Sequence, residues 1–111
     1  MTVTAIDLFS QPVQLPGGSW TLSAFHATSN AEVHADHWEI HDEADEVVSC
    51  LDGALHLHLR GDRAGEDDVV ALTSGSAVVV PRGRWHRIEL DRPSDILAVT
   101  VRRGTRHEKR A

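Results

Sequence analysis

GSAVVVPRGRWHRIEL at residues 75–90 and EIHDEADEVVSCLDG at residues 39–53 are the two stretches that decide the fold of this chain. In the earlier stretch Glu39 and His41 are two residues apart, so on a strand both side chains point to the same face. Carboxylates and imidazoles are ligands that first-row divalent metals accept, and a metal site is therefore the leading hypothesis. The four side chains that we expect to hold the metal are those of Glu39, His41, Glu46 and His86.

Outside these stretches the chain shows short strands separated by turn residues at intervals of about ten residues, which is typical of a β-sandwich or barrel. Asp52-Gly53 predicts a tight turn, and residues 91–95 are also expected to turn the chain. No long helical period competes with this pattern, so the predicted fold class is all-β. We expect strands over residues 20–27, 33–41, 55–60, 69–72, 77–80, 84–90 and 96–101.

One domain accounts for the whole chain of 111 residues. Its barrel is expected to span residues 19–101. Residues 1–18 are predicted to form an irregular N-terminal extension, with either a short helix or an edge strand around residues 5–10. Residues 102–111 form a basic C-terminal tail. We expect this tail to be a solvated terminus, because it is short and lacks the aromatic residues of a nucleic-acid-binding arm.

The composition argues against several classes of partner. A formal charge of −6 argues against a general nucleic-acid binder, since phosphate contacts need clustered lysine and arginine. No apolar stretch approaches the ~20 residues of a membrane helix, so no membrane contact is expected. The single cysteine, Cys50, allows no intramolecular disulfide, and residues 1–11 lack the features of a secretion signal. These two observations favour a cytoplasmic location.

The spacing of the first stretch resembles the first of the two motifs of the cupin superfamily. Glu39 and His41 stand one spacer apart, four spacers precede Glu46, and six more precede Gly53. This is the spacing of the usual motif, except that Glu39 stands where the family pattern has a histidine. The resemblance therefore includes one departure, and it falls on a proposed metal ligand.

The second stretch matches the second cupin motif in full. The pattern requires a glycine, a proline, a second glycine and a histidine, separated by five, one and two residues. Gly75, Pro81, Gly83 and His86 have this spacing. The chain is thus similar to small single-domain bacterial cupins. This resemblance implies a single barrel of the double-stranded β-helix, or jelly-roll, type.

Glu39 has two possible roles in such a site. It is either a fourth ligand, giving two histidines and two carboxylates, or it stands back from a three-ligand site as a catalytic base. A divalent ion with one carboxylate carries a net charge of about +1, whereas two ionised carboxylates bring the net charge to about zero. The second arrangement weakens the attraction of the site for anionic substrates and its acidification of bound water.

The resemblance implies one divalent first-row metal as cofactor, which is iron(II), manganese, nickel or zinc. Oxygen ligands tilt the preference toward the first three, and His41, His86 and one carboxylate resemble the facial triad of iron oxygenases. The implied function is a metal-dependent enzyme acting on a small molecule, of dioxygenase, isomerase or lyase type. The alternative is a noncatalytic barrel that binds a small ligand or metal. Burying Glu39 beside Glu46 without a cation would force one of them to stay protonated, which favours a bound cation.

Residues of matching parity are expected to line the pocket. Val48 and Cys50 share the parity of Glu46, and Ile88 shares that of His86, so they should form an apolar inner wall. Cys50 is expected to act as a small hydrophobic residue rather than a nucleophile. His37 has the parity of Glu39 and either lines the mouth of the cavity or ends its strand in solvent.

The remaining histidines and two tryptophans have weaker assignments. Trp38 and Trp85 adjoin proposed ligands and point to the opposite face, so we expect them in a homodimer interface or an outer layer, with core packing as the alternative. His56 and His58 alternate with leucines and should face solvent or a partner subunit, with a second metal site as the alternative. His34 is assigned to a loop, and His26 and His107 have no motif support, although residues 104–108 are able to fold near the mouth of the barrel.

Overall fold

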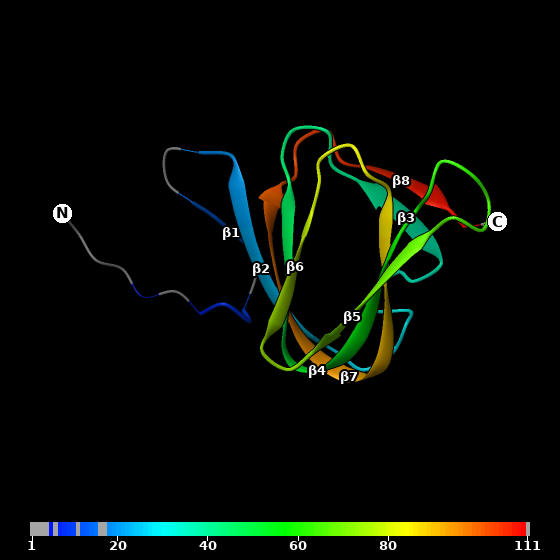
Figure 1. Cartoon of the computed structure of the whole chain (residues 1–111). Helices are drawn as coiled ribbons and strands as arrows, with labels where there is room; N and C mark the ends of the chain where they lie inside the picture. The colour runs from blue at the N-terminus through cyan, green and yellow to red at the C-terminus, as the bar shows by residue number, and fades with distance from the viewer. Residues whose placement is uncertain (1–4, 6, 11, 16–17, 111) are drawn as a thin grey trace.

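The structure, a computed structural model, describes residues 5, 7–10, 12–15 and 18–110, and these residues form an all-β barrel (Figure 1). This confirms the predicted fold class. No helix among these residues is long and apolar enough to cross a membrane. The strands are β1 (Val13–Gln14), β2 (Trp20–Ala27), β3 (His37–Ile40), β4 (Glu46–Leu59), β5 (Asp68–Thr73), β6 (Ser76–Val80), β7 (His86–Val101) and β8 (Arg106–Lys109).

Two long strands, β4 and β7, run through both halves of the barrel and pair with each other along most of their length. In one half, the order of antiparallel neighbours is β1, β2, β7, β4 and β6. In the other half, the order is β8, β3, β7, β4 and β5. Figure 1 shows the two halves facing each other, with β4 and β7 bending at the bottom of the view. The metal-capable residues therefore reach the same interior from different strands.

Both turns expected at the middle of these strands are absent, and that part of the prediction is wrong. The chain does not reverse at Asp52-Gly53 or at residues 91–95; β4 and β7 continue through both segments. Their pairing shifts register between Cys50 and Leu55, with Asp52 opposite Asp95 and Ala54 opposite Arg92. Such β-bulges bend a strand without ending it, so turn-forming residues mark a shared bend here.

Gly53 is required at that bend for two reasons. Its φ of +123° lies in a region that residues with a side chain rarely adopt. A Cβ added at this position would also lie 2.7 Å from both the Cα and the Cβ of Ser94. The Ser94 hydroxyl in turn accepts a hydrogen bond of 3.1 Å from the Ala54 amide. The glycine of the first motif thus lets β4 pass close to β7.

The hydrophobic core lies between the two halves and follows the alternation of β4. Val48, Cys50, Leu55 and Leu57 are fully buried, and the residues that alternate with them, apart from the bend at Gly53, are at least partly exposed. Burial of each large aliphatic side chain stabilises the fold by about 1.5–3 kcal/mol. The core cluster comprises Ala27, Val48, Cys50, Leu55, Leu57, Leu59, Leu72, Val80 and Ile96.

The C-terminal segment is more ordered than a solvated tail. Strand β8 pairs with β3, with Glu39 opposite His107 and Trp38 opposite Glu108. Its four side chains remain exposed, so RHEK has no hydrophobic alternation from which a strand could be predicted. At the other end of the chain residues 8–10 form a turn, residue 6 of the ambiguous span 5–10 lies outside the described residues, and β1 is a short edge strand on β2.

Candidate metal centre

Four metal-capable side chains converge at one end of the barrel. One ligand atom from each lies within 4.8 Å of the others. The fold brings them together because Glu46 is the first residue of β4, His86 is the first residue of β7 and pairs with Glu39 on β3, and His41 follows β3 directly. Motif glycine Gly83, with φ of +78°, donates its amide to the His41 carbonyl over 2.8 Å and so ties the two motifs together. The residues that the structure gathers are Glu39, His41, Glu46 and His86.

This cluster is largely shielded from water. His41, Glu46 and His86 are buried, whereas Glu39 retains a quarter of its side-chain exposure. The Nε2 atom of His86 lies 2.9 Å from Oε1 of Glu46. The Nε2 atom of His41 lies 2.8 Å from Oε1 of Glu39 and 3.3 Å from Oε2 of Glu46. Each carboxylate therefore approaches an imidazole nitrogen, and the two rings lie 5.3 Å apart between centroids.

The orientation of both imidazoles suits metal coordination. Nδ1 of His86 lies 3.0 Å from the Arg84 carbonyl, which only accepts, so this nitrogen donates and Nε2 faces the cluster. Nδ1 of His41 lies 2.8 Å from the Thr105 hydroxyl. Such outer contacts hold metal-binding histidines in place.

One polar atom of the cluster lacks a partner. Nε2 of His41 is buried and, despite its short distances to two carboxylates, makes no aligned hydrogen bond. This nitrogen therefore has charge contacts but no hydrogen bond of good geometry, and a metal ion would satisfy it. Two imidazoles and two carboxylates also form a donor set that first-row divalent metals accept. The residues present therefore fit a divalent metal ion.

In the protein without metal, the pKa values are shifted toward the charged forms. Burial is the largest influence on the pKa of Glu39 and raises it. The close contact and charge of His41, the charge of Arg102 and the His107 hydrogen bond outweigh burial and lower that pKa from 4.5 to about 2. Burial likewise opposes the charged form of His41, yet the two carboxylates raise its pKa from 6.5 to about 9. The pKa of Glu46 is also lowered, since its contacts with His41 and His86 outweigh burial.

These shifts change one expectation from the sequence. We expected that Glu39 and Glu46, buried together without a cation, would leave one carboxylate protonated. The pKa values of both are lowered instead, because the His41 side chain supplies the positive charge between them. Metal binding must then displace the proton from His41, since a coordinating imidazole nitrogen is unprotonated.

Three residues that the motifs do not contain also surround the cluster. Nε2 of His107 lies 2.8 Å from Oε2 of Glu39, and the guanidinium of Arg102 lies 3.6 Å from Oε1 of the same carboxylate. Thr105 contacts His41 as described above. All three belong to the C-terminal segment, whose position depends on β8. The only sequence signal was that residues 104–108 are able to fold near the mouth of the barrel.

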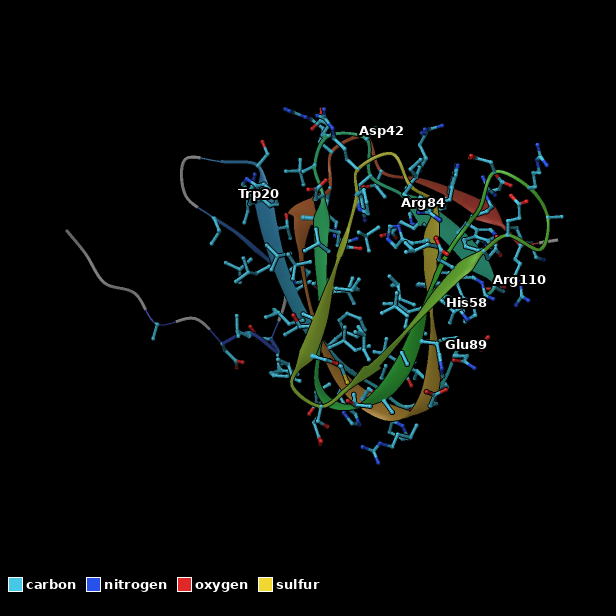
Figure 2. The ribbon with its side chains drawn as sticks, viewed as in Figure 1. Trp20, Asp42, His58, Arg84, Glu89 and Arg110 are labelled. Carbon is cyan, nitrogen blue, oxygen red and sulfur yellow. The ribbon has the colours of Figure 1, made fainter. Side chains whose placement is uncertain are left out.

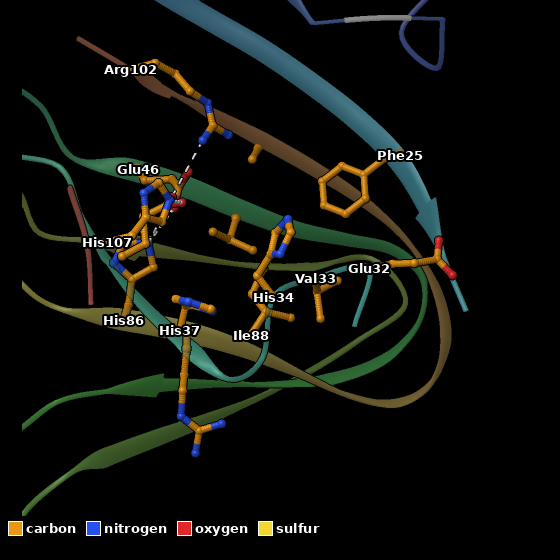
Figure 3. Close-up of a pocket in the computed structure, with 14 residues that line it drawn as sticks. Phe25, Glu32, Val33, His34, His37, Glu46, His86, Ile88, Arg102 and His107 are labelled. Carbon is orange, nitrogen blue, oxygen red and sulfur yellow. Dashed lines mark hydrogen bonds and ion pairs between the residues drawn. The ribbon is translucent and has the colours of Figure 1, made fainter. Parts of the chain in front are cut away.

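A cavity of about 280 Å³ opens beside the cluster (Figure 3). Its polar end contains the exposed side of the cluster, with Arg102 and His107. Its apolar wall is formed by Phe25, Val33, Val48, Ile88 and Ala98. The cavity thus joins a metal-capable site to a surface that suits a small organic molecule.

The structure places three of the four residues predicted for the pocket, His37, Val48 and Ile88, in the lining of this cavity. Cys50 is not among the lining residues; it is fully buried in the core cluster. It lies two residues beyond Val48 on β4, which carries it about 6.6 Å further along the strand. Burial raises the pKa of its thiol, consistent with a hydrophobic role. His34 lies in the expected loop, and its imidazole also lines the cavity.

The two tryptophans lie on the outer side, in a stack with arginines. The Arg60 guanidinium lies 4.7 Å from the ring centroid of Trp85 and 5.6 Å from that of Trp38. Arg87 contacts the Trp38 ring at 5.3 Å and Arg106 contacts the Trp85 ring at 5.6 Å. Trp38 is buried by these groups of its own chain, so it does not present a surface to a partner subunit. Of the two predicted positions, the outer layer describes this arrangement better than the dimer interface does.

His56 and His58 are half-buried on the outer face of β4. They alternate with buried leucines, so their side chains point to the opposite face. Nδ1 of His56 is 2.8 Å from Asp91, and Nε2 of His58 is 3.7 Å from Glu89. Figure 2 shows His58 and Glu89 together on the side of the barrel. Within the part of the chain that the structure describes, these residues do not form a cluster of metal-capable groups. The alternative of a second metal site there is not supported.

Comparison with solved structures supports the fold. A cupin-2 domain protein from Shewanella frigidimarina aligns with a TM-score of 0.59 and 18% identity, over 87% of this chain and 85% of that one. A hydroquinone 1,2-dioxygenase in complex with Cd²⁺ and 4-hydroxybenzonitrile aligns with a TM-score of 0.57 and 22% identity, over 75% of this chain and 58% of that one. Bacillus subtilis oxalate decarboxylase, described with Mn(II) centres, aligns with a TM-score of 0.60 and 13% identity, over 81% of this chain and 23% of that one.

Comparison at the level of sequence supports the same conclusion. No curated protein matches this sequence significantly. The family model described as the cupin domain matches residues 25–102, which include both motifs, all four residues of the cluster and Arg102. The barrel, the paired motifs and this match agree, and the chain belongs to the cupin family.

Proposed function

We propose that this cupin is a metal-dependent enzyme that acts on a small molecule, in a reaction of dioxygenase, isomerase or lyase type. The observation that carries this proposal is the convergence of two imidazoles and two carboxylates beside a cavity of about 280 Å³. Nε2 of His41, which makes no aligned hydrogen bond, belongs to this cluster. Iron(II), manganese, nickel and zinc all accept these ligands. A metal site with a purely structural role does not need a cavity of this kind beside it.

The ligands in this proposal are His41, His86 and Glu46, with Glu39 as the fourth. A bound divalent ion would polarise an oxygen atom of the substrate and lower the pKa of a bound water. The chain's own contribution is a set of groups held in fixed positions. Arg84 and Thr105 orient the imidazoles, and the apolar wall of the cavity excludes water from one side of the substrate.

Glu39 differs from the other three ligands in its surroundings. One carboxylate oxygen faces His41 and the other faces His107, and the side chain is partly exposed at the cavity. This position allows Glu39 to coordinate the metal through one oxygen. It equally allows a role as a base that accepts a proton from a substrate in the cavity. Both roles require the same residue, and the experiment below separates them.

Two of the structural relatives support a role in metal chemistry. The hydroquinone 1,2-dioxygenase was solved with Cd²⁺, and the oxalate decarboxylase is described with Mn(II) centres. Identities of 22% and 13% show a shared fold rather than a shared reaction. They support the expectation that this barrel holds a metal at its motif residues, and they leave the reaction open among several types.

A noncatalytic barrel that binds a small ligand is the second candidate function. The observation that favours it is the internal charge balance of the cluster, in which His41, Arg102 and His107 all approach the Glu39 carboxylate. A site that neutralises its own carboxylates has less need of a metal ion. In this case the cavity would bind its ligand without chemistry.

We further propose a homodimer and a cytoplasmic location. An apolar row crosses the outer face of the first half of the barrel, where Val47 lies between Val79 and Val99 on the neighbouring strands. Val47 and Val79 are exposed, and a second subunit would cover them. Cys50 is a free thiol, which is ordinary in a reducing compartment.

Elemental analysis of protein purified without chelator tests the main proposal. We expect about one first-row metal ion per chain and loss of the metal in the double variant His41→Ala with His86→Ala. The matched control replaces His56 and His58 with alanine, since these histidines lie outside the cluster, and should keep the metal. Absence of metal after reconstitution with iron(II), manganese, nickel and zinc would favour the noncatalytic barrel. Glu39→Gln distinguishes the roles of Glu39, because a base is lost without loss of metal, whereas a ligand is lost together with metal affinity.

A further inference from the structure

We propose that the cavity binds a small carboxylate with an apolar body, and that Arg102 is the residue that binds its carboxylate group. This inference rests on the metal-dependent function proposed above and names the substrate class of the same site. It concerns a residue outside the two motifs, placed at the polar end of the cavity.

Arg102 is positioned to bind a ligand. It follows the last residue of β7 and lines the cavity, at the end that also holds Glu46 and His107 (Figure 3). Its guanidinium lies 3.6 Å from Oε1 of Glu39, which is too long for a good hydrogen bond. The side chain is also 42% exposed and lines the cavity, so other groups of the protein do not cover it fully. A planar guanidinium of this kind recognises carboxylates through paired hydrogen bonds.

The charges of the site explain why an anion would need Arg102. Two ionised carboxylates, Glu39 and Glu46, reduce the net charge of a bound divalent ion to about zero, so the metal alone attracts anions weakly. Coordination of Glu39 to the metal would also occupy the oxygen that now faces Arg102. The guanidinium would then contribute a positive charge without a close partner. The polar end of the cavity therefore suits one negative charge.

The other end of the cavity sets the remaining features of the ligand. Figure 3 shows Arg102 beside the cluster, with Phe25, Val33 and Ile88 further along the cavity and Glu32 at the far end. The Glu32 carboxylate is held by the Thr28 hydroxyl and would repel a second negative charge there. A cavity of about 280 Å³ lies at the small end of the range for ligand pockets. A small monocarboxylate with an aliphatic or aromatic body fits these conditions.

Binding of carboxylates and their uncharged amides to zinc-loaded protein tests this inference. The probes are benzoate and hexanoate, each compared with benzamide and hexanamide by calorimetry. We expect wild-type protein to bind at least one carboxylate about 10- to 100-fold more tightly than its amide, and Arg102→Gln to lose this preference. Arg102→Lys, which keeps the charge but not the planar fork, should retain part of it.

Arg103→Gln is the matched control. Arg103 is the next residue and is exposed, but it pairs with Glu43 at 2.9 Å and is absent from the cavity lining. This variant should bind all four probes as the wild type does. Equal carboxylate preference in Arg102→Gln and wild type, or no binding of either carboxylate to wild type, would overturn the inference.

Measuring metal content in every sample separates this inference from the function on which it rests. Arg102→Gln should retain its zinc while losing the carboxylate preference. If wild-type protein takes up no metal but still binds carboxylates through Arg102, the substrate class stands and the enzymatic proposal fails. If metal is bound and the preference does not depend on Arg102, the enzymatic proposal stands and this inference fails.

Discussion

Glu39 on β3 lies directly opposite His107 on β8, and its Oε2 atom is 2.8 Å from Nε2 of that histidine. Glu39, which stands in place of a histidine of the first cupin motif, is thus held by a segment that lies outside both motifs. The same segment supplies Thr105 to His41. The C-terminal residues therefore belong to the candidate metal centre, and their contacts lead to the first prediction.

Thr105→Val should weaken metal binding. The substitution keeps the shape of the side chain but removes the hydroxyl that lies 2.8 Å from Nδ1 of His41. Loss of such an outer partner typically reduces metal affinity about 10- to 100-fold. Competition with a chromophoric chelator for zinc measures the change. Thr73→Val, at an exposed position of β5, is the control and should not differ from wild type. Equal zinc affinity in both variants would show that Thr105 does not orient His41.

The stability of the metal-free protein should be greatest between about pH 4.5 and 6.5. The pKa of His41 is raised from 6.5 to about 9, so its contribution is complete below pH 6.5 and is lost as the pH rises through 9. The pKa of Glu39 is lowered from 4.5 to about 2, so its contribution is complete above pH 4.5 and is lost as the pH falls through 2. Each loss should be on the order of 2 kcal/mol.

Urea unfolding in the presence of a chelator, repeated across this pH range, measures the effect. Glu39→Gln should reduce both arms of the profile. The acidic arm that remains comes from Glu46, whose pKa is also lowered, and the alkaline arm shrinks because one of the two carboxylates that raise the pKa of His41 is gone. An unfolding free energy that stays constant from pH 6 to pH 10 in wild-type protein would contradict the proposed pairing.

Gly53→Ala should destabilise the fold more than Gly65→Ala. Both glycines have positive φ, so each substitution costs about 1 kcal/mol or more in backbone strain. An added Cβ at Gly65 meets no atom within 4 Å, whereas at Gly53 it meets Ser94. The difference between the two variants combines this clash with the greater backbone strain at φ +123°, and it should be about 2 kcal/mol. Urea midpoints at constant slope give both values. Equal midpoints would mean that the β4 bend relaxes without cost.

Arg60→Ala should loosen the C-terminal strand. Arg60 stacks between the rings of Trp38 and Trp85 and donates to Glu108 on β8 over 2.9 Å. Loss of these contacts should cost about 1–2 kcal/mol, red-shift the tryptophan emission and weaken zinc binding through β8. Arg63→Ala, at an exposed loop position, is the control. We expect amide hydrogen exchange at residues 106–109 to become faster in Arg60→Ala and to stay unchanged in Arg63→Ala. Unchanged exchange at these residues in Arg60→Ala would contradict the role of Arg60 in holding β8.

The sequence was informative where side-chain type and local spacing determine structure. Glu39, His41, Glu46 and His86 could be grouped because two motifs with independent spacings specify where each side chain points. The turn signals at Gly53 and Asp95 were misleading, because a bulge and a turn use the same residues and only the pairing of β4 with β7 distinguishes them. The role of β8 could not be predicted, because an exposed strand held by backbone hydrogen bonds leaves no hydrophobic pattern.

The continuity of β4 and β7 has a consequence for how this site can change. Each strand begins at a residue of the cluster, Glu46 or His86, and then runs into the hydrophobic core. The candidate ligands thus lie at the ends of these two strands, and the hydrophobic core is built from the residues between those ends and from neighbouring strands. A substitution at residue 39 or 102 alters the charge of the cluster, while the aliphatic packing between the two halves of the barrel still maintains the geometry. The barrel is in this sense tolerant of new chemistry, and the glutamate at position 39 is an instance of that tolerance.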